Sequence, residues 1–326
     1  MTATATGIGS LPGTDMAVAL RFVTSELAEF VHLPELPARG APATMIGRTV
    51  ALLQGLGADL QPAGWRLTDA PGADQRRAVS LLSQDLDLLE EHTQGYAGPL
   101  KVQVAGPWTL AATMERPRGD RVLADHGARH ELAQSLAEGV AVHVADLARR
   151  IPGAELAVQV DEPGLTAVLG GRVPTASGFS RHRSVQAAQA SAALTELTSA
   201  IEAAGARAVA HSCAADVPVT LLVQSGFRAL SFDLSLASPT DDWANAFEAG
   251  VDLWPGVVPV AQPVDPTMER LLVEQVQRFF DALGHEVGEV SARLVITPAC
   301  GLAGASPSWA REALRLARVV ATAVGQ

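Results

Sequence analysis

A histidine and two cysteines are the residues of this sequence whose types and spacing best suit metal chemistry. His211 and Cys213 stand two apart at the end of the apolar run 207–210, and Cys300 follows the apolar run 293–297. Alternate residues of an extended strand point to the same face, so an imidazole nitrogen and a sulfur would meet at one point. If the two runs are neighbouring parallel strands, the three side chains predict a site for a soft cation such as zinc. The alternative is a buried small hydrophobe beside a core histidine.

Further polar residues stand at the ends of other apolar runs. Asp233 ends the run beside His211, so we expect its carboxylate to be the fourth zinc ligand. Asp161 shares a strand face with Gln159 and could hold a substrate ammonium group, or else cap a helix. Ser10 follows small residues whose backbone N–H groups could meet a substrate carboxylate, although an ordinary turn would look the same.

The proposed donor atoms predict thiol chemistry rather than hydrolysis. Two thiolates make a metal site electron-rich, and zinc lowers the pKa of a bound thiol, which keeps it a nucleophilic thiolate at neutral pH. Hydrolytic zinc sites favour nitrogen and oxygen ligands, because these leave the metal a stronger Lewis acid. A small substrate thiol is therefore the ligand that this site predicts.

The rest of the sequence alternates between short β-rich runs and longer stretches with helical spacing. Eight strands are predicted, over residues 4–9, 65–67, 100–104, 155–160, 207–210, 229–232, 251–254 and 293–297. Nine helices are predicted, over residues 15–30, 72–92, 108–114, 130–150, 185–204, 217–224, 241–248, 266–283 and 306–324. Such alternation predicts parallel strands with right-handed crossovers, here an α/β fold with a single (β/α)₈ TIM barrel over residues 1–326.

A barrel would also collect the polar candidates, because catalytic groups of this fold sit at the C-terminal ends of the strands. An open doubly wound sheet is the alternative, but no Gly-x-Gly-x-x-Gly motif follows the first strand. The proline-rich stretch 33–42 suits neither element and predicts a long loop or part of the barrel mouth.

The composition limits the classes of partner and compartment. The chain has 326 residues, 48% of them hydrophobic, and a formal net charge of −11. It can bury a large core, and no basic face is concentrated enough for nucleic acid. No apolar stretch approaches the length of a membrane span, and the first residues lack the pattern of a signal peptide. Two cysteines are no disulfide framework, so we expect a cytoplasmic protein with both as thiols or thiolates.

Four motifs together resemble the catalytic domain of cobalamin-independent methionine synthase. They are Ile-Gly-Ser-Leu-Pro at 8–12, Val-Gln-Val-Asp-Glu-Pro at 158–163, His-Ser-Cys at 211–213 and Cys-Gly-Leu at 300–302. They follow the order of the family and extend over nearly the whole chain. The length resembles the single-barrel, core type of this family rather than the two-barrel enzyme.

The resemblance implies a (β/α)₈ barrel whose zinc ion binds the homocysteine thiolate, and methyl transfer to that sulfur to give methionine. By the same matching, the zinc ligands would be His211, Cys213 and Cys300. Ser10 would lie at the amino-acid carboxylate, and Asp161, the predicted catalytic carboxylate, at its ammonium group. Glu35 would correspond to the acidic loop contact that the family makes to homocysteine.

The sequence departs from the family at two places. The carboxylate ligand of the family is a glutamate, where this chain has Asp233. The family also has an Asp-Ile-His-Ser-Pro stretch after the seventh strand, whose histidine is the expected proton donor, and residues 252–258 of this chain contain no histidine. A methylfolate needs that proton when its amine leaves, so the methyl donor could be a methylfolate or a methylcorrinoid carried by another protein.

The leading hypothesis is therefore a cytoplasmic, zinc-dependent methyltransferase acting on homocysteine, with no nucleic-acid or membrane partner. One alternative is a metal-free lyase related to the uroporphyrinogen decarboxylases, although the sequence lacks an arginine-rich opening segment for several substrate carboxylates. The other alternative is a non-catalytic barrel that binds a thiol or a methyl carrier.

Overall fold

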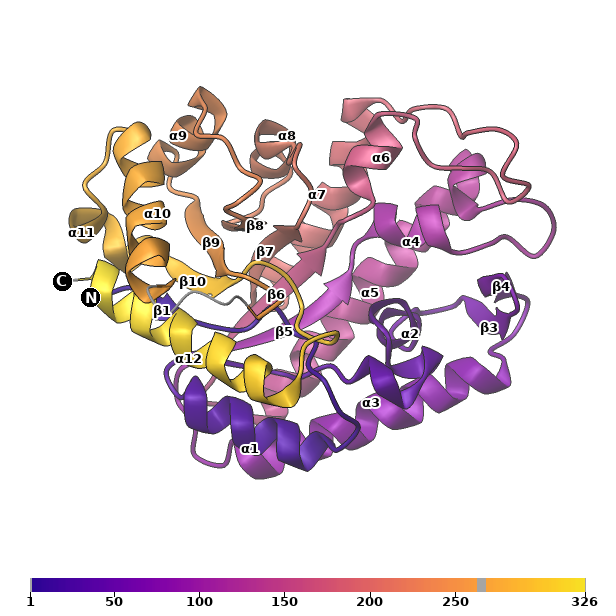
Figure 1. Cartoon of the computed structure of the whole chain (residues 1–326). Helices are drawn as coiled ribbons and strands as arrows, with labels where there is room; N and C mark the ends of the chain where they lie inside the picture. Colours follow the sequence, from indigo (N-terminus) through magenta and orange to yellow (C-terminus); the bar gives the residue numbers. More distant parts are fainter. Residues whose placement is uncertain (1, 263–267, 326) are drawn as a thin grey trace.

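Eight parallel strands form one curved sheet surrounded by helices in the computed structural model, which describes residues 2–262 and 268–325 (Figure 1). In sheet order the strands are β1 (Thr4–Ala5), β10 (Val295–Pro298), β9 (Asp252–Val258), β8 (Ala229–Asp233), β7 (Arg207–Ser212), β6 (Glu155–Asp161), β5 (Pro99–Ala105) and β2 (Val31–His32). A parallel bridge between Ser10 and Glu35 connects the two edge strands just beyond their C-terminal ends. The predicted TIM-barrel-like fold is confirmed.

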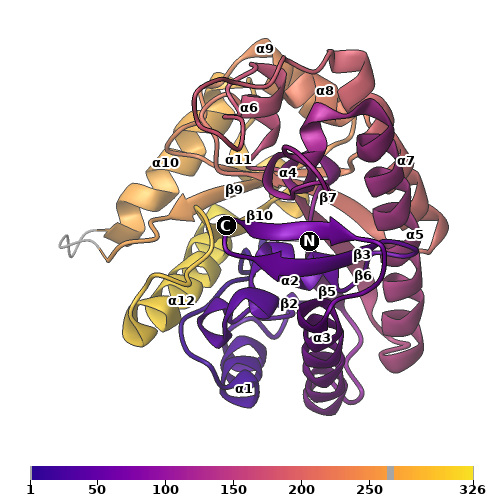
Figure 2. The ribbon, with the colours of Figure 1, turned by 90° about the vertical axis from the view of Figure 1, so that its right-hand side faces the viewer.

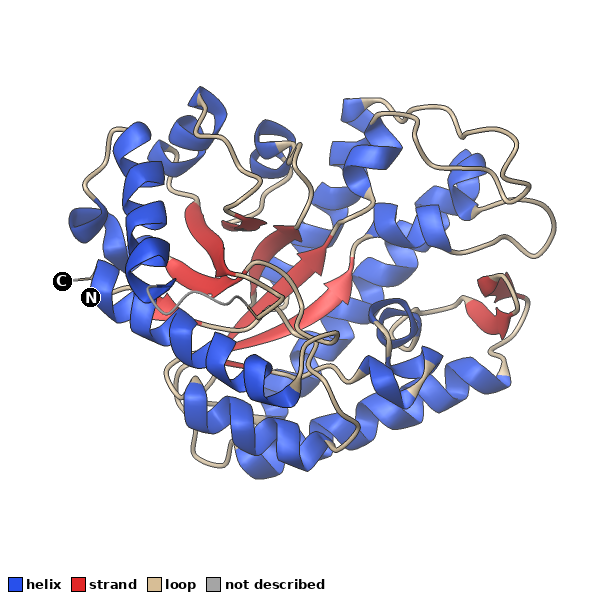
Figure 3. Cartoon of the chain, in the orientation of Figure 1, coloured by secondary structure: helices blue, strands red, loops and turns tan. Residues whose placement is uncertain are grey.

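Helices surround the strands on the outside of the sheet, as Figure 3 shows by colour. They are α1 (Met16–Glu26), α2 (Met45–Val50), α3 (Ala73–His92), α4 (Pro107–Thr113), α5 (His126–Arg150), α6 (Leu165–Leu169), α7 (Ala187–Ala203), α8 (Val219–Gln224), α9 (Asp241–Glu248), α10 (Met268–Ala282), α11 (Val287–Val290) and α12 (Pro307–Val324). Residues 266–267 of the predicted helix 266–283 lie outside the described residues.

Side-chain caps fix where several of these helices begin, including α1 and α12. The Asp15 carboxylate accepts the Val18 N–H at 2.9 Å before α1, and the Ser306 hydroxyl accepts the Trp309 N–H at 3.1 Å before α12. Each bond satisfies one of the free N–H groups of a first helical turn. Within the described residues, none of the helices combines the length and the apolarity that a membrane crossing requires.

The prediction of the second barrel strand is wrong. Residues 65–67 belong to β4 (Gly64–Thr68), which pairs antiparallel with β3 (Gly57–Gln61) in a hairpin separate from the eight-stranded sheet. Figure 2 shows this hairpin facing the viewer. The true second strand is β2, which pairs with β5 and is only two residues long. A two-residue strand is too short to show the alternation of apolar and polar residues that predicts a strand. Strand β4 of the hairpin does show this alternation, with every second residue buried.

Strand β9 runs four residues beyond the predicted end at Trp254. The chain stays extended through Pro255 and Gly256. Glycine fits at position 256 because a Cβ there would lie 2.8 Å from backbone atoms of both flanking strands. Trp254 is therefore not at the barrel mouth. It is 1% exposed and packs edge-on against Phe30, with ring centroids 5.3 Å apart, among residues from the N-terminal halves of the strands.

Candidate active site

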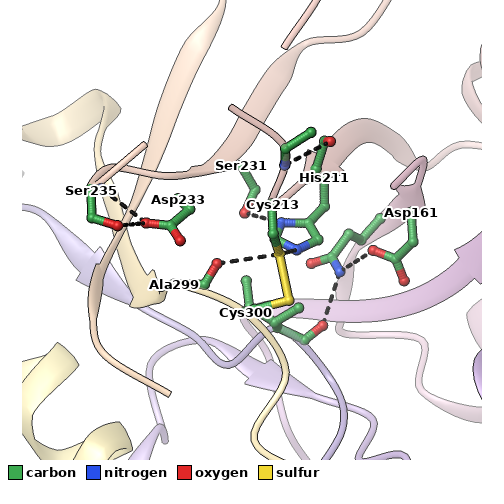
Figure 4. The surroundings of a disulfide bond; sticks show 12 residues. Asp161, His211, Cys213, Ser231, Asp233, Ser235, Ala299 and Cys300 are labelled. Carbon is green, nitrogen blue, oxygen red and sulfur yellow. Dashed lines mark hydrogen bonds between the residues drawn. A yellow bond between two sulfur atoms is a disulfide. The ribbon is translucent and has the colours of Figure 1, made fainter. Parts of the chain in front are cut away.

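His211, Cys213 and Cys300 converge at the C-terminal end of the barrel (Figure 4). One imidazole nitrogen and the two sulfurs lie within 4.8 Å of one another, and the described residues contain no second group of this kind. Nε2 of His211 lies 3.1 Å from the Cys213 sulfur, and Nδ1 lies 2.9 Å from the Ser231 hydroxyl. The serine contact occupies one ring nitrogen and leaves the other facing the sulfur.

The strands that carry these residues are not neighbours, which corrects the sequence prediction. β7 pairs with β6 and β8, whereas β10 pairs with β1 and β9. The side chains meet because the sheet curves, so that residues at the ends of strands far apart in sheet order approach one another across the mouth.

The two cysteines form a disulfide in this structure, with their Cα atoms 6.2 Å apart. The expectation that both are thiols or thiolates is therefore wrong for this state of the protein. The expectation came from their small number, but residues 87 positions apart in the chain lie at a separation that suits a disulfide. The thiolate is the form of cysteine that binds a metal, so the bond must be reduced before these sulfurs can be metal ligands.

Asp233 stands at the end of β8, as predicted, but its carboxylate lies apart from the three converging groups. Its Oδ1 accepts the backbone N–H of Ser235 at 2.9 Å and the Ser235 hydroxyl at 2.6 Å (Figure 4). Whether it becomes a metal ligand stays a prediction.

A pocket of about 330 Å³ opens beside the His–Cys–Cys group. Apart from Asp233, all of the predicted site residues line it: Ser10, Glu35, Asp161, His211, Cys213 and Cys300. Ile8, Pro37, Met45, Pro163 and Gly301 complete the wall. Its volume falls at the lower end of the range for small-molecule sites. The sequence predicts all of these site residues except Glu35 at strand ends, and the barrel collects them around one cavity.

Glu35 and Asp161 give one side of this pocket two buried carboxyl groups. The Oδ1 of Asp161 accepts from Gln159 Nε2 at 2.7 Å, and Glu35 Oε1 lies 3.3 Å from Arg48 Nε. Burial raises the pKa of Asp161 well above its ordinary value, and the charge of Glu35 adds to this rise. Burial likewise raises the pKa of Glu35, against the opposing charges of Arg48 and Lys101. A cationic ligand group would relieve both carboxylates.

Lys101 is a buried cation that the sequence reasoning missed. It is the only lysine of the chain, it has no solvent exposure, and its Nζ donates to the Ile8 carbonyl at 2.9 Å. Gln159 Nε2 donates to the same oxygen at 2.9 Å, which connects Lys101 to the residue that holds Asp161. Burial lowers the pKa of Lys101 to about 7, although the nearby carboxylates oppose this change. A signal was present, because Lys101 and Gln103 alternate within an apolar strand.

Two glycines allow the close approach of Ser10 to the site. Gly9 has φ of +149°, a conformation that side chains rarely adopt. A Cβ at Gly301, which follows Cys300, would lie only 2.1 Å from the Ser10 hydroxyl oxygen. The serine hydroxyl therefore lies beside the end of β10.

The segment after β9 begins later than the sequence indicated. Residues 252–258 form the strand itself, so the segment that follows begins at Pro259. The sequence from 259 to 267 also contains no histidine. His211 itself has no additional proton to donate at neutral pH, since burial, aided by the charge of Lys101, lowers its pKa to about 3.

A family model described as the catalytic domain of cobalamin-independent synthase matches residues 97–323. The chain belongs to this family. The solved structure of a B12-independent methionine synthase from Shewanella sp. W3-18-1, in complex with selenomethionine, matches this synthase-family chain with a TM-score of 0.63. The two are 13% identical over 99% of this chain and 98% of the other.

A second structural match shows how far the fold extends beyond this synthase family. A GH20 catalytic module of the pneumococcal exo-beta-D-N-acetylglucosaminidase StrH matches with a TM-score of 0.52 and 9% identity, over 98% of this chain and 85% of the other. Identities this low show the fold alone, and function must be argued from the site. The comparison with curated protein sequences gives no match.

Proposed function

We propose that this synthase-family barrel is a zinc-dependent methyltransferase that forms methionine from homocysteine. The observation that carries the proposal is the convergence of His211, Cys213 and Cys300 beside a pocket that also holds Ser10, Glu35 and Asp161. One end of such a pocket suits a sulfur, and the other suits an α-amino acid. Membership of the family and the selenomethionine complex of the Shewanella enzyme agree with this substrate.

The donor atoms fit zinc once the disulfide is reduced. One imidazole nitrogen and two thiolates are ligands that zinc prefers, and three protein ligands leave a position for an exchangeable group. Bound zinc would lower the pKa of the substrate thiol and keep it a thiolate at neutral pH. Asp233 is the proposed fourth ligand, and its carboxylate would have to leave the Ser235 contacts to take that role.

The protein side chains then bind and orient the amino acid. Glu35 and Asp161 accept hydrogen bonds from the ammonium group, and Ser10 donates to the carboxylate. Ser231 holds the His211 ring, and Gln159 holds the Asp161 carboxylate, so a proposed zinc ligand and an ammonium acceptor are both in place before the substrate binds. Holding the substrate in one orientation lowers the entropy cost of the displacement at the methyl carbon.

The missing histidine favours a methylcorrinoid as the donor over a methylfolate. The substrate sulfur loses its proton and forms a bond to the methyl carbon, while the bond from that carbon to the donor breaks and its electron pair leaves with the donor. A folate nitrogen that leaves in this way must be protonated. A corrinoid leaves as Co(I) with the electron pair and needs no proton, so the absence of histidine from residues 259–267 does not obstruct it.

A second candidate, a barrel that binds a thiol or a methyl carrier without turnover, is favoured by the same missing histidine. It shares the proposed metal site and pocket with the first. Only repeated methionine formation separates the two.

Metal analysis tests the site first. Reduced wild-type protein, incubated with zinc and freed of excess metal, is expected to hold one zinc per chain. His211→Ala and Cys300→Ser should lose most of it, because each removes one of three donors. His126→Ala, at an exposed histidine that begins α5, is the matched control and should keep its zinc. Equal zinc in all four proteins would refute the proposed ligands.

Turnover is tested by incubating the reduced, zinc-loaded protein with homocysteine and either methylcobalamin or 5-methyltetrahydrofolate. We expect methionine in excess over protein, faster with the corrinoid. Homocysteine binding without methionine from either donor would favour the non-catalytic barrel. A protein that binds neither zinc nor homocysteine would contradict the proposal.

A further inference from the structure

A chain of buried ion pairs extends from the pocket to the outer helices. Arg48, on α2, places Nε 3.3 Å from Glu35 and donates from its terminal nitrogen to Asp85 on α3 at 2.9 Å. Arg39 donates to both oxygens of Asp85, each at 2.7 Å. The side chains of Arg48, Glu35 and Asp85 are all less than a tenth exposed. Charges this deeply buried are costly unless they are paired, so loss of one partner would leave an unfavourable buried charge.

Among the residues of these ion pairs, only Glu35 lines the pocket. Its backbone is fixed by the bridge to Ser10 and by the donation of its N–H to the Gly9 carbonyl at 3.1 Å. Within the described part of the chain, its carboxylate has one direct cationic contact, Arg48. Asp85 orients that arginine from the other side, since one guanidinium contacts both carboxylates.

We propose that Arg48 is a positioning residue, which keeps the Glu35 carboxylate ionised and directed toward the ammonium group of the bound thiol amino acid. This inference rests on the proposed function, because it assigns the ammonium group of homocysteine to Glu35. Arg48 itself does not line the pocket and acts only through Glu35.

The charges around Glu35 explain why an arginine is needed there. Burial favours the neutral acid, and Asp85 and Asp161 add negative charge nearby. Only Arg48 and Lys101 oppose these effects, and Lys101 contacts the Ile8 carbonyl rather than Glu35. A neutral Glu35 would have to release a proton each time it bound an ammonium group, and this would weaken binding at neutral pH.

The test compares two thiols that differ only in the ammonium group, homocysteine and 4-mercaptobutyrate. Their dissociation constants are measured by calorimetry on the reduced, zinc-loaded protein. Arg48→Met is expected to weaken homocysteine binding about tenfold at pH 7. This is the loss expected when removal of the cation raises the pKa of Glu35 by about one unit. Binding of 4-mercaptobutyrate should change less than twofold, which also shows that the variant is folded and holds its metal.

The pH profile separates this role from a merely structural one. In Arg48→Met the affinity for homocysteine should rise with pH relative to 4-mercaptobutyrate, because the ammonium ligand must displace a proton from Glu35. Proton release, measured in two buffers of different ionisation enthalpy, should exceed that of the wild type. Arg48→Lys keeps the charge and should restore the wild-type profile.

Two further variants complete the test. Arg39→Met removes an equal charge two ion pairs further from the pocket and should leave the preference for homocysteine within twofold of the wild type. In a Glu35→Gln background, Arg48→Met should cause no additional loss. If the wild type prefers homocysteine and Arg48→Met keeps both that preference and the wild-type pH profile, the role of Arg48 is overturned while the proposed function stands. A wild type that binds neither thiol would overturn both.

Discussion

Lys101 offers a direct test of the electrostatics beneath the pocket, because the sequence contains no other lysine. Its ammonium group lies in the barrel interior without solvent exposure, and burial lowers its pKa from 10.5 to about 7. Between these two values the unfolded chain holds a proton that the folded protein lacks. The free energy of unfolding must therefore rise with pH in this window, and the gain is absent below pH 7.

The magnitude follows from the size of this window. At about 1.4 kcal/mol per pH unit, a fall from 10.5 to about 7 corresponds to about 5 kcal/mol between pH 7 and 10.5. The neighbouring carboxylates, Glu35 and Asp161, increase the difference in stability between the wild type and a variant without Lys101 as the pH rises. Without this cation, both carboxyl groups keep their protons to higher pH in the folded variant, so its free energy of unfolding falls as the pH rises.

Two measurements check this prediction. Protein labelled with ¹³C at the ε carbon of lysine should give one NMR signal, and its shift should titrate near pH 7 instead of 10.5. Urea unfolding of reduced, metal-free wild type and Lys101→Met should then be compared from pH 7 to 9.5. The difference in free energy of unfolding should grow in favour of the wild type by about 3 kcal/mol across this range.

The comparison uses the change with pH rather than stability at one pH. Lys101→Met removes a costly buried charge but also leaves two carboxylates without this cation, so these effects oppose one another at a single pH. Ile8 keeps one donor to its carbonyl, from Gln159, in the variant. A lysine signal that titrates near 10.5, or a stability difference that does not vary with pH, would refute the reasoning.

Three further predictions concern the site and its support. Zinc uptake should require reductant: the oxidised protein should bind less than a tenth of the zinc that the reduced protein binds, and equal uptake by both would contradict thiolate ligation. Gly301→Ala should force the Ser10 hydroxyl to rotate away, because the new Cβ would lie 2.1 Å from its oxygen; calorimetry should show homocysteine binding weakened about tenfold with zinc content unchanged, the loss of about one hydrogen bond to a charged group. Gly139→Ala, inside α5, should lower the free energy of unfolding by about 3 kcal/mol, because its Cβ would meet the Leu52 carbonyl oxygen at 1.9 Å. Gly127→Ala in the same helix is the control, since its Cβ would make only an ordinary contact of 3.4 Å and should not destabilise the protein. Equal urea midpoints for the two variants would contradict the packing argument.

Most barrel strands could be predicted because their apolar runs are long enough to differ from the helices around them. The strand over 100–104, for example, differs from β5 by one residue at each end. Strand β2 could not be found in the same way, since its two residues obtain their structure from pairing with β5. The predicted strand 251–254 ends before Pro255 and Gly256 because proline and glycine are depleted in strands, but Gly256 here fits a crowded position between two neighbouring strands.

The site was predictable where spacing alone fixes direction. His211 and Cys213 meet because residues two apart in an extended chain share a face. The position of Asp233 at a strand end was also predictable, but the direction of its carboxylate depends on Ser235 in the following loop. The sequence predicted that Cys213 and Cys300 converge, but not that their sulfurs are bonded, because two thiols that bind one metal ion also lie close enough to form a disulfide.

The two sides of the pocket come from different parts of the barrel. The sulfur side is built on β7 and β10, and the amino-acid side on Ser10, Glu35 and Asp161. Both sides of the proposed site are present in this chain, while the histidine expected to protonate a leaving amine is missing from the segment after β9. If the protein is catalytically active, the leaving group of its methyl donor must depart without being protonated. On the proposed function, the choice of donor would therefore depend on the missing histidine rather than on how the thiol is held.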